Sequence, residues 1–216
     1  MDQALNLCHS LATYNIEANE AFYNNLLEGC AKNVCIDMAF SVFDVMEAKS
    51  LKATVVTYNS LIEACIGINQ LNKAWEILDH MKTQGVQPDR YSYCFLFKGI
   101  RNPGHKTHLA KALDLALSWD VNERAQQMYQ HKFCYNVLLN ACINCNEMGR
   151  ALELLEKMNS GDDEAKPDEI SYNTLIKGCV KNRELETAFR MFNSMLENGL
   201  KPNDVTYNSL IDACVR

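Results

Sequence analysis

The sequence contains no run of about 18 consecutive apolar residues, the length that a membrane-spanning helix needs. It also contains no glycine-rich phosphate loop, no His-Glu-x-x-His pattern and no Ser/His/Asp set. Basic residues are not in excess, because the net charge is −6. These absences argue against a membrane protein and against an enzyme. We therefore expect no membrane partner, no small-molecule substrate and no cofactor, and we expect any catalytic domain to lie outside this sequence.

Ten cysteines suggest, at first, a metal site or disulfides. Cys142 and Cys145 have the spacing of a zinc-ligand pair, but a four-ligand site would need a second Cys or His pair beside them. Several cysteines instead recur seven residues after a repeated tyrosine. They are Cys30, Cys65, Cys142, Cys179 and Cys214. Because free cysteine is a small and readily buried apolar residue, we interpret this set as core packing and predict no metal site.

A pattern of 35 residues repeats along the chain. Its marker is the dipeptide Tyr-Asn, and one further copy has Tyr-Cys. The copies are Tyr23-Asn24, Tyr58-Asn59, Tyr93-Cys94, Tyr135-Asn136, Tyr172-Asn173 and Tyr207-Asn208. Successive copies are 35 residues apart, except for intervals of 42 and 37 residues before the fourth and fifth copies. A period of this size indicates a solenoid, a propeller or an array.

Each repeat predicts two helices. Apolar residues follow the tyrosine at helical spacing, as from Tyr58 to Cys65, and a second such stripe follows, as from Ala74 to Met81. Gly85 and Gly199 stand where a helix C-cap is expected, and a proline follows shortly after each. A single hairpin cannot bury its outer apolar face, so neighbouring hairpins must stack. The predicted fold class is therefore all-α, an α-solenoid of stacked antiparallel helix pairs.

The repeats form a single array over residues 1–216. The complete repeats are 20–54, 55–89, 90–131, 132–168 and 169–203, and the partial repeats are 1–19 and 204–216. The third repeat is longer than its neighbours by seven residues, which we assign to insertions within 102–106 and 120–130. Neither end carries the polar capping element that such arrays need. We therefore expect the chain to be a segment of a longer protein.

The motif Val-Val-Thr-Tyr-Asn-Ser-Leu-Ile, which begins at Val55, and the ending Gly-Val-Gln-Pro-Asp, which closes at Asp89, resemble the pentatricopeptide repeat. The resemblance covers essentially the whole chain. The third repeat departs most, because it has Cys94 in place of asparagine and no Pro-Asp ending. The resemblance implies a right-handed solenoid in which each repeat binds one base of a single-stranded RNA that runs parallel to the protein. Single-stranded RNA suits this mode because its base edges and faces are accessible.

By the resemblance, the fifth residue and the last residue of each repeat select the base. The candidate base-reading residues are Asn24 with Thr54, Asn59 with Asp89, Cys94 with His131, Asn136 with Asp168, Asn173 with Asn203, and Asn208. In the family, Asn with Asp favours uracil and Asn with Asn favours cytosine. The pair in the first repeat leans toward pyrimidines, and the pair in the third repeat is assigned no base. The predicted target core is therefore 5′-pyrimidine-U-any-U-C-3′. The alternative is structural, because asparagine near a helix start can cap the helix or bond to nearby backbone.

By the same resemblance, the second residue of each repeat is an apolar wedge that sandwiches the base. The candidates are Ala21, Val56, Tyr91, Phe133, Ile170 and Val205. The alternative for the aliphatic wedges is partial burial between stacked repeats. A basic residue near the end of each first helix would contact phosphate, and the candidates are Lys32, Arg101, Lys181 and Arg216. The second and fourth repeats have Gly67 and Asn144 there, so we expect uneven phosphate contact.

Two functions remain open. The first is a sequence-selective RNA-binding module that acts in the processing, stability or translation of transcripts in the mitochondrion or plastid, a location implied by the resemblance. The second is a helical scaffold that binds protein, for instance within a mitochondrial ribosome or another large assembly. The paired residues of the second, fourth and fifth repeats favour the first function. The acidic net charge and the irregular third repeat favour the second.

Overall fold

The computed structural model describes residues 18–118, 125–160 and 166–215, without the side chains of residues 125–131. The partial repeat expected at 1–19 therefore lies almost wholly outside the described residues. So do Arg216 and the side chain of His131, two of the candidate site residues.

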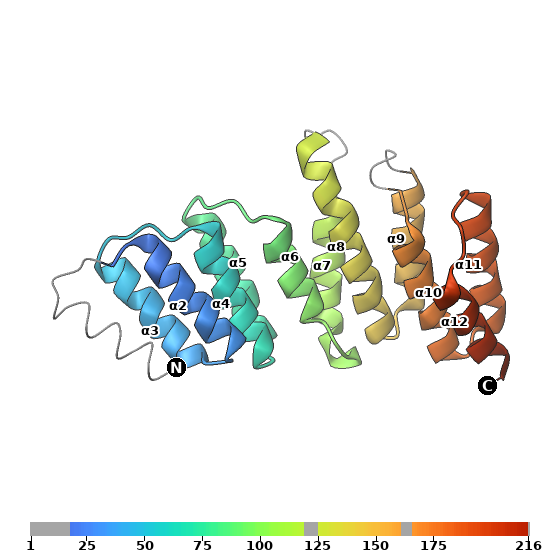
Figure 1. The fold of residues 1–216 in the computed structure, drawn as a ribbon, viewed down its shortest axis with the longest axis horizontal. Helices are drawn as coiled ribbons and strands as arrows, with labels where there is room; N and C mark the ends of the chain where they lie inside the picture. Colours follow the sequence, from blue (N-terminus) through green and yellow to red (C-terminus); the bar gives the residue numbers. More distant parts are fainter. Residues whose placement is uncertain (1–17, 119–124, 161–165, 216) are drawn as a thin grey trace. The chain divides into compact units, whose positions relative to one another are not determined.

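The described residues form eleven α-helices and one 3₁₀ helix, with no strand among them, so the predicted all-α class is confirmed (Figure 1). The helices are α2 (Glu20–Lys32), α3 (Ile36–Ala48), α4 (Val55–Gly67), α5 (Leu71–Thr83), α6 (Arg90–Lys98), η1 (Pro103–His105), α7 (Lys106–Ser118), α8 (Ala125–Asn144), α9 (Met148–Ser160), α10 (Glu169–Asn182), α11 (Leu185–Glu197) and α12 (Asp204–Val215). Even-numbered helices are the first helices of the repeats and odd-numbered helices the second. None of those described is long and apolar enough to cross a lipid bilayer.

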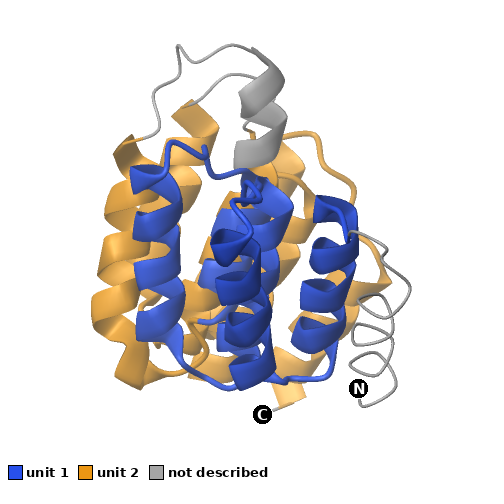
Figure 2. Cartoon of the chain, turned by 90° about the vertical axis from the view of Figure 1, so that its left-hand side faces the viewer, with its two compact units in different colours: residues 1–99 blue, residues 100–216 orange. Residues whose placement is uncertain are grey.

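The chain divides into two compact units, residues 1–99 and residues 100–216, which Figure 2 shows in different colours. In the first unit, α4 packs against α2, α3, α5 and α6. In the second unit, α10 packs against α8, α9, α11 and α12. Each central first helix is thus covered by the hairpins on both sides, as stacking of repeats requires.

The cores of both units consist of the stripes that the sequence predicts. From Tyr58 to Cys65 the stripe residues are at most 2% exposed, and the stripe from Ala74 to Met81 is buried as well. The last helix differs, because Tyr207 and Ile211 are 52% and 60% exposed. No described helix follows α12 to cover them.

Residues with left-handed backbone conformation end the hairpins at regular positions. Gly85 and Gly199 have φ values of 75° and 73° and follow the C-caps of α5 and α11, Gln84 and Asn198, which confirms the glycines as helix-terminating residues. In the first repeat Ser50 occupies this place with φ 56°. The turns inside the hairpins use Val34, Asn69, Asn146 and Arg183, all with φ between 58° and 61°.

The third repeat departs from this regular pattern at two places. Its first helix α6 has only 9 residues, against 13 in α4, and the connection to α7 contains the 3₁₀ turn η1. Helix α8 begins at Ala125, seven residues before the predicted start of the fourth repeat. Residues 125–131 contain no glycine or proline to end a helix, so part of the second insertion extends α8 backwards.

The repeated cysteines lie in these cores. Cys30, Cys65, Cys142 and Cys179 are fully buried, whereas Cys214 on α12 is exposed. Burial raises the pKa of Cys65 and Cys179 to about 11 and the pKa of Cys142 to about 12. These thiols therefore stay protonated and poorly nucleophilic near neutral pH.

Among the described cysteines, alkylation of the native protein at pH 8 is accordingly expected to modify Cys214 and the half-buried Cys35 first, and to spare Cys65, Cys142 and Cys179. Peptide mass spectrometry after a short iodoacetamide pulse measures this order, and a pulse in denaturant is the control in which all thiols react. Rapid native labelling of Cys142 would contradict the predicted core.

Candidate nucleic-acid interface

The last residue of the first, second, fourth and fifth repeats caps the next first helix, and these residues are Thr54, Asp89, Asp168 and Asn203. The last residue of the third repeat, His131, lies inside α8 instead. The Asp89 carboxylate Oδ1 accepts from the backbone N–H of Ser92 at 2.9 Å, and the Asp89 N–H donates to Ser92 Oγ at 3.2 Å. Asp168 and Ser171 repeat this capping box at 3.0 and 3.2 Å. Such caps stabilise a helix by about 0.5–2 kcal/mol, so these residues have a structural task.

The fifth residue is directed to that cap from the preceding first helix. Asn59 Nδ2 donates to Asp89 Oδ1 at 3.0 Å, and Asn136 Nδ2 donates to Asp168 Oδ1 at 3.1 Å. Asn173 Nδ2 donates to Asn203 Oδ1 at 3.3 Å. The structure therefore brings together the fifth and last residues of the second, fourth and fifth repeats. In these three repeats the asparagine amides bond to side chains, and in the described structure they neither cap the helix nor bond to nearby backbone.

A third side chain joins each pair of fifth and last residues, and the three together form what we call a cluster. This third residue was not identified from the sequence. The hydroxyl of the third residue of the following repeat donates to the asparagine Oδ1: Ser92 to Asn59 at 2.6 Å, Ser171 to Asn136 at 2.5 Å, Thr206 to Asn173 at 2.6 Å, and Thr57 to Asn24 at 2.7 Å. All four hydroxyl residues are 0% exposed. The signal was present, since a serine or threonine two residues before the asparagine recurs in most repeats.

The hydrogen bonds within a cluster leave some of its polar atoms available to a ligand. In the second repeat, Asp89 Oδ1 accepts from Asn59 and Ser92, while Asp89 Oδ2 accepts no bond from the described residues. Asn59 Nδ2 has two protons and gives one to Asp89. The pair thus retains one N–H donor beside one carboxylate acceptor, and the fourth repeat has the same arrangement.

The fifth repeat presents a different set. Asn203 Oδ1 accepts from the N–H groups of Val205 and Thr206, which fixes the direction of the amide. Asn203 Nδ2 therefore points away from the cap, where Glu169 Oε2 lies 3.4 Å from it. A donor replaces the carboxylate acceptor of the other two repeats.

The remaining candidate readers do not form this arrangement. Asn24 and Thr54 share no direct hydrogen bond in the described structure, and both contact Thr57 instead. Cys94 is 2% exposed on α6, so its side chain offers little to a ligand. Asn208 is exposed on α12.

The predicted wedges are exposed. Val56, Tyr91, Phe133, Ile170 and Val205 are between 42% and 62% exposed, and Ala21 is exposed as well. The aliphatic wedges Val56, Ile170 and Val205 are therefore accessible to a ligand, and roughly half of each is also covered, so both interpretations of them remain predictions. Exposed apolar side chains at one position of successive first helices suit a ligand with flat faces.

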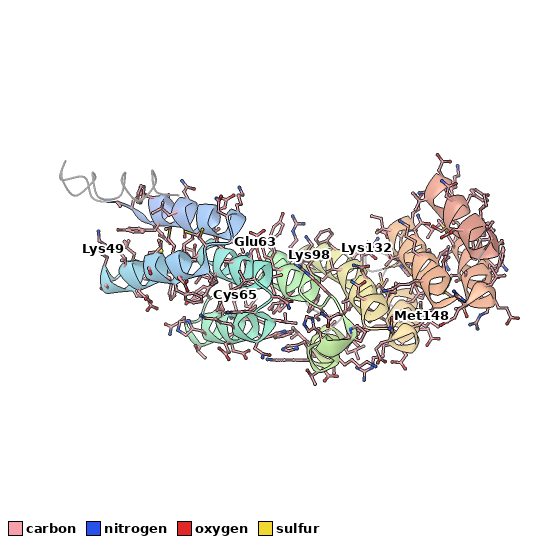
Figure 3. The ribbon with its side chains drawn as sticks, turned by 90° about the horizontal axis from the view of Figure 1, so that it is seen from below. Lys49, Glu63, Cys65, Lys98, Lys132 and Met148 are labelled. Carbon is pink, nitrogen blue, oxygen red and sulfur yellow. The ribbon has the colours of Figure 1, made fainter. Side chains whose placement is uncertain are left out.

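The charges on the first helices are uneven. Lys32 is held by Glu28 at 2.6 Å, and its pKa is raised by that hydrogen bond, by the charge of Glu28 and by the nearby Glu63. Glu63 and Lys98 occupy equivalent positions in α4 and α6 (Figure 3). Arg101 is exposed after α6. On α10, Lys177 and Lys181 are exposed and line an open hollow with Ser209 and Asp212. Within each unit, the local charge therefore differs from one repeat to the next.

Metal ligands do not gather among the described side chains. No group of three His, Cys, Asp or Glu residues there is arranged to hold a metal ion. Cys142 and Cys145 are both buried, and the Cys145 thiol contacts the carbonyl oxygen of Asn102 at 3.1 Å.

Known proteins share both the sequence pattern and the fold. The chain is 38% identical over 63 residues to pentatricopeptide repeat-containing protein At5g10690 of Arabidopsis thaliana, which covers 29% of this chain and 10% of that protein. It is 34% identical over 70 residues to pentatricopeptide repeat-containing protein At3g09650, chloroplastic, of the same plant, covering 32% of this chain and 9% of that protein. The chain thus matches only a small part of these relatives.

A solved structure has the same fold over most of the chain. The PPR domain of Arabidopsis thaliana protein-only RNase P 1, crystallised in complex with tRNA, aligns with a TM-score of 0.60 over 92% of this chain and 100% of that chain, at 14% identity. The sequence model of the PPR repeat family matches residues 18–67, 53–102 and 167–216, and the PPR repeat model matches residues 133–161. These matches cover well over half of the sequence, and the chain belongs to the pentatricopeptide repeat family.

Proposed function

We propose that this chain is an RNA-binding module that reads single-stranded RNA at about one base per repeat. The observation that carries the proposal is the pairing of Asn59 with Asp89 and of Asn136 with Asp168, at 3.0 and 3.1 Å, each with a donor and an acceptor left for a ligand. The proposed target core is 5′-pyrimidine-U-any-U-C-3′, with the RNA parallel to the chain.

The unused polar atoms fit these bases. Uracil presents a carbonyl acceptor next to the N3–H donor, which matches the free asparagine N–H and the free Asp Oδ2. Cytosine has an unprotonated N3, which accepts a hydrogen bond. The Asn203 amide can donate to it, whereas a carboxylate would repel it. The second and fourth repeats therefore suit uracil, and the fifth suits cytosine.

The exposed wedges supply the complementary surface for the base faces. Val56, next to the capped start of α4, and Ile170, in the first turn of α10, are 55% and 62% exposed in the absence of RNA. Packing of a base against such side chains contributes on the order of 1–3 kcal/mol per base. Ala21 offers the smallest surface, so the first repeat is expected to bind its base most weakly.

Phosphate contact is also expected to differ from one repeat to the next. Lys181 and Lys177 present two cations on α10, whereas Lys32 on α2 is already paired with Glu28. Screening over roughly 8 Å at physiological salt makes such local charge more important than the net charge of −6.

Neutralising the acids around Lys32 is expected to strengthen RNA binding. The double variant Glu28→Gln/Glu63→Gln leaves Lys32 free to contact phosphate, and affinity should rise about two- to fivefold per charge at low salt. Anisotropy titrations at two salt concentrations measure the effect. Glu76→Gln/Glu156→Gln, at two exposed acids on the second helices α5 and α9, is the control with the same change in net charge. An equal gain from that control would argue against a phosphate contact by Lys32.

Fluorescence anisotropy with labelled RNA tests the proposal directly. One RNA contains the predicted core, and a second has purines at the positions of the second, fourth and fifth repeats, each measured at two salt concentrations. Tighter binding to the predicted core, lost in Asn59→Ala and Asn136→Ala, is the expected result. Equal or undetectable binding to both would reject base reading and favour a protein-binding scaffold, the function that the acidic net charge would suit.

The relatives support one setting for this activity. One of them carries the description chloroplastic, which supports action on transcripts of a plastid or mitochondrion, in their processing, stability or translation. Any enzymatic activity of a longer protein would reside in a separate domain.

A further inference from the structure

The asparagine amide in each reading pair has two possible orientations that differ by exchange of its oxygen and nitrogen. Base reading, as proposed above, depends on this choice, because one orientation offers an N–H and the other a carbonyl oxygen. In the fourth repeat, Asn136 Nδ2 lies 3.1 Å from Asp168 Oδ1 and Asn136 Oδ1 lies 2.5 Å from Ser171 Oγ. The surroundings of these two atoms decide which orientation is stable.

The serine hydroxyl is bound so that its proton is available for the amide. Ser171 Oγ accepts from the backbone N–H of Asp168 at 3.2 Å, and its two possible acceptors are Asn136 Oδ1 at 2.5 Å and Asp168 Oδ1 at 3.1 Å. The shorter contact takes the proton. An exchanged amide would lose this bond and would place its oxygen against the carboxylate of Asp168. A buried, fully desolvated hydroxyl makes such a loss expensive.

The same hydroxyl accompanies four of the candidate reading asparagines. Asn24, Asn59, Asn136 and Asn173 are each followed by a Thr or Ser at the third position of the next repeat, with Oγ to Oδ1 distances between 2.5 and 2.7 Å. The one repeat with cysteine at the fifth position, Cys94, is followed by Cys134 at that third position. The hydroxyl and the amide are thus present or absent together.

We propose that the third residue of each following repeat, Thr57, Ser92, Ser171 or Thr206, is a positioning residue that fixes the orientation of the reading asparagine of the repeat before it. It contacts no base. It holds the amide N–H toward the last residue and toward the ligand, so specificity for one base is divided among three residues from two successive repeats. This inference rests on the proposed function, because it assigns the specificity of the same site.

Isosteric removal of the hydroxyl tests the assignment. Thr206→Val keeps the shape of the side chain and removes the donor to Asn173, and Thr206→Ser restores it. The readout is the ratio of affinities for RNAs with cytosine and with adenine opposite the fifth repeat. The same ratio for uracil and adenine opposite the fourth repeat, where Ser171 is intact, is the internal reference.

Thr206→Val is expected to lower the fifth-repeat ratio about two- to tenfold while the fourth-repeat ratio stays constant, and Thr206→Ser is expected to restore the ratio. Ser171→Ala should show the converse pattern. An equal fall of both ratios, or of overall affinity alone, would indicate only a weakened capping box and would overturn the assignment.

A measurement without RNA separates this inference from the proposed function. The side-chain amide signals of Asn173 in a ¹H–¹⁵N spectrum of the free protein are expected to be sharp and slow to exchange in the native chain. They should broaden or exchange faster in Thr206→Val but not in Thr206→Ser. Unchanged amide signals in Thr206→Val would reject the positioning role even if the native chain reads RNA. Failure of the native chain to discriminate bases would reject the proposed function while leaving the amide result intact.

Discussion

Replacing Asp168 by asparagine is expected to change the base preferred by the fourth repeat from uracil to cytosine. The substitution exchanges a carboxylate acceptor for an amide whose oxygen stays on the cap and whose nitrogen faces the ligand, as Asn203 already does in the fifth repeat. Uracil N3–H then loses its acceptor, and cytosine N3 gains a donor. Matching one base edge is worth about 1–3 kcal/mol, so the ratio of the two affinities should shift by roughly 5- to 150-fold in total. Anisotropy with RNAs that differ only at this base measures the shift.

The reciprocal variant Asn203→Asp is the matched control and is expected to change the preference of the fifth repeat from cytosine to uracil. Both residues are N-caps, and aspartate and asparagine cap equally well, so Asp168→Asn should leave the melting temperature unchanged. Asn203→Asp should lower it slightly, because its carboxylate lies beside Glu169 Oε2. A preference that is unchanged in both variants, with RNA binding retained, would show that the last residue does not select the base.

Replacing Gly178 by valine is expected to destabilise the second unit. A Cβ atom at this position of α10 would lie 2.7 Å from two side-chain atoms of Ile143 and 2.8 Å from Met148 Cε. Real Cβ contacts are not this short, so the side chains of Ile143 and Met148 must shift, and the two methyl groups of valine crowd the same space further. Overpacking of this kind costs about 1–3 kcal/mol, which lowers the melting temperature of a chain of this size by roughly 2–12 °C. Thermal melting followed by circular dichroism measures the change.

Gly149→Ala is the matched control, because a Cβ atom there meets nothing within 4 Å on the exposed side of α9. It should leave the melting temperature unchanged or raise it slightly. Equal melting of Gly178→Val and the native chain would mean that α10 does not approach α8 and α9 as closely as the structure has it.

Much of the fold could be predicted because the helices bury apolar residues that recur at helical spacing, and this spacing can be seen directly in the sequence. The stripe from Tyr172 to Cys179 and the helix-ending Gly199 are examples in which local chemistry and packing agree. The start of α8 at Ala125 could not be placed, because the apolar period indicates where a helix packs and not how far it extends beyond its neighbours. Residues 125–131 have good helix propensity and no stop signal, and neither property marks a boundary.

Only part of the candidate site could be predicted, because sequence position alone does not show which side chains come together. The resemblance named the fifth and last residues, and the structure joins Asn136 to Asp168. The resemblance did not name Ser171, whose hydroxyl lies in the same cluster. A serine in the first turn of a helix commonly takes part in capping that helix. Only its short distance to Asn136 Oδ1 shows that Ser171 also holds the asparagine amide. Cys94 is the opposite case. Its position in the repeat made it a candidate base-reading residue, but its side chain is buried and cannot contact a ligand.

The N-capping role of the last residue restricts how binding preferences can evolve in this array. Only a few side chains start a helix well, and Thr54, Asp89, Asp168 and Asn203 all belong to that group. Exchanges among them change the hydrogen-bonding character offered to a ligand at little cost in folding free energy. A substitution outside the group would weaken the junction between two repeats. Under the proposed function, a lineage carrying such arrays is therefore expected to acquire new targets by single-residue steps, without compensating mutations in the core.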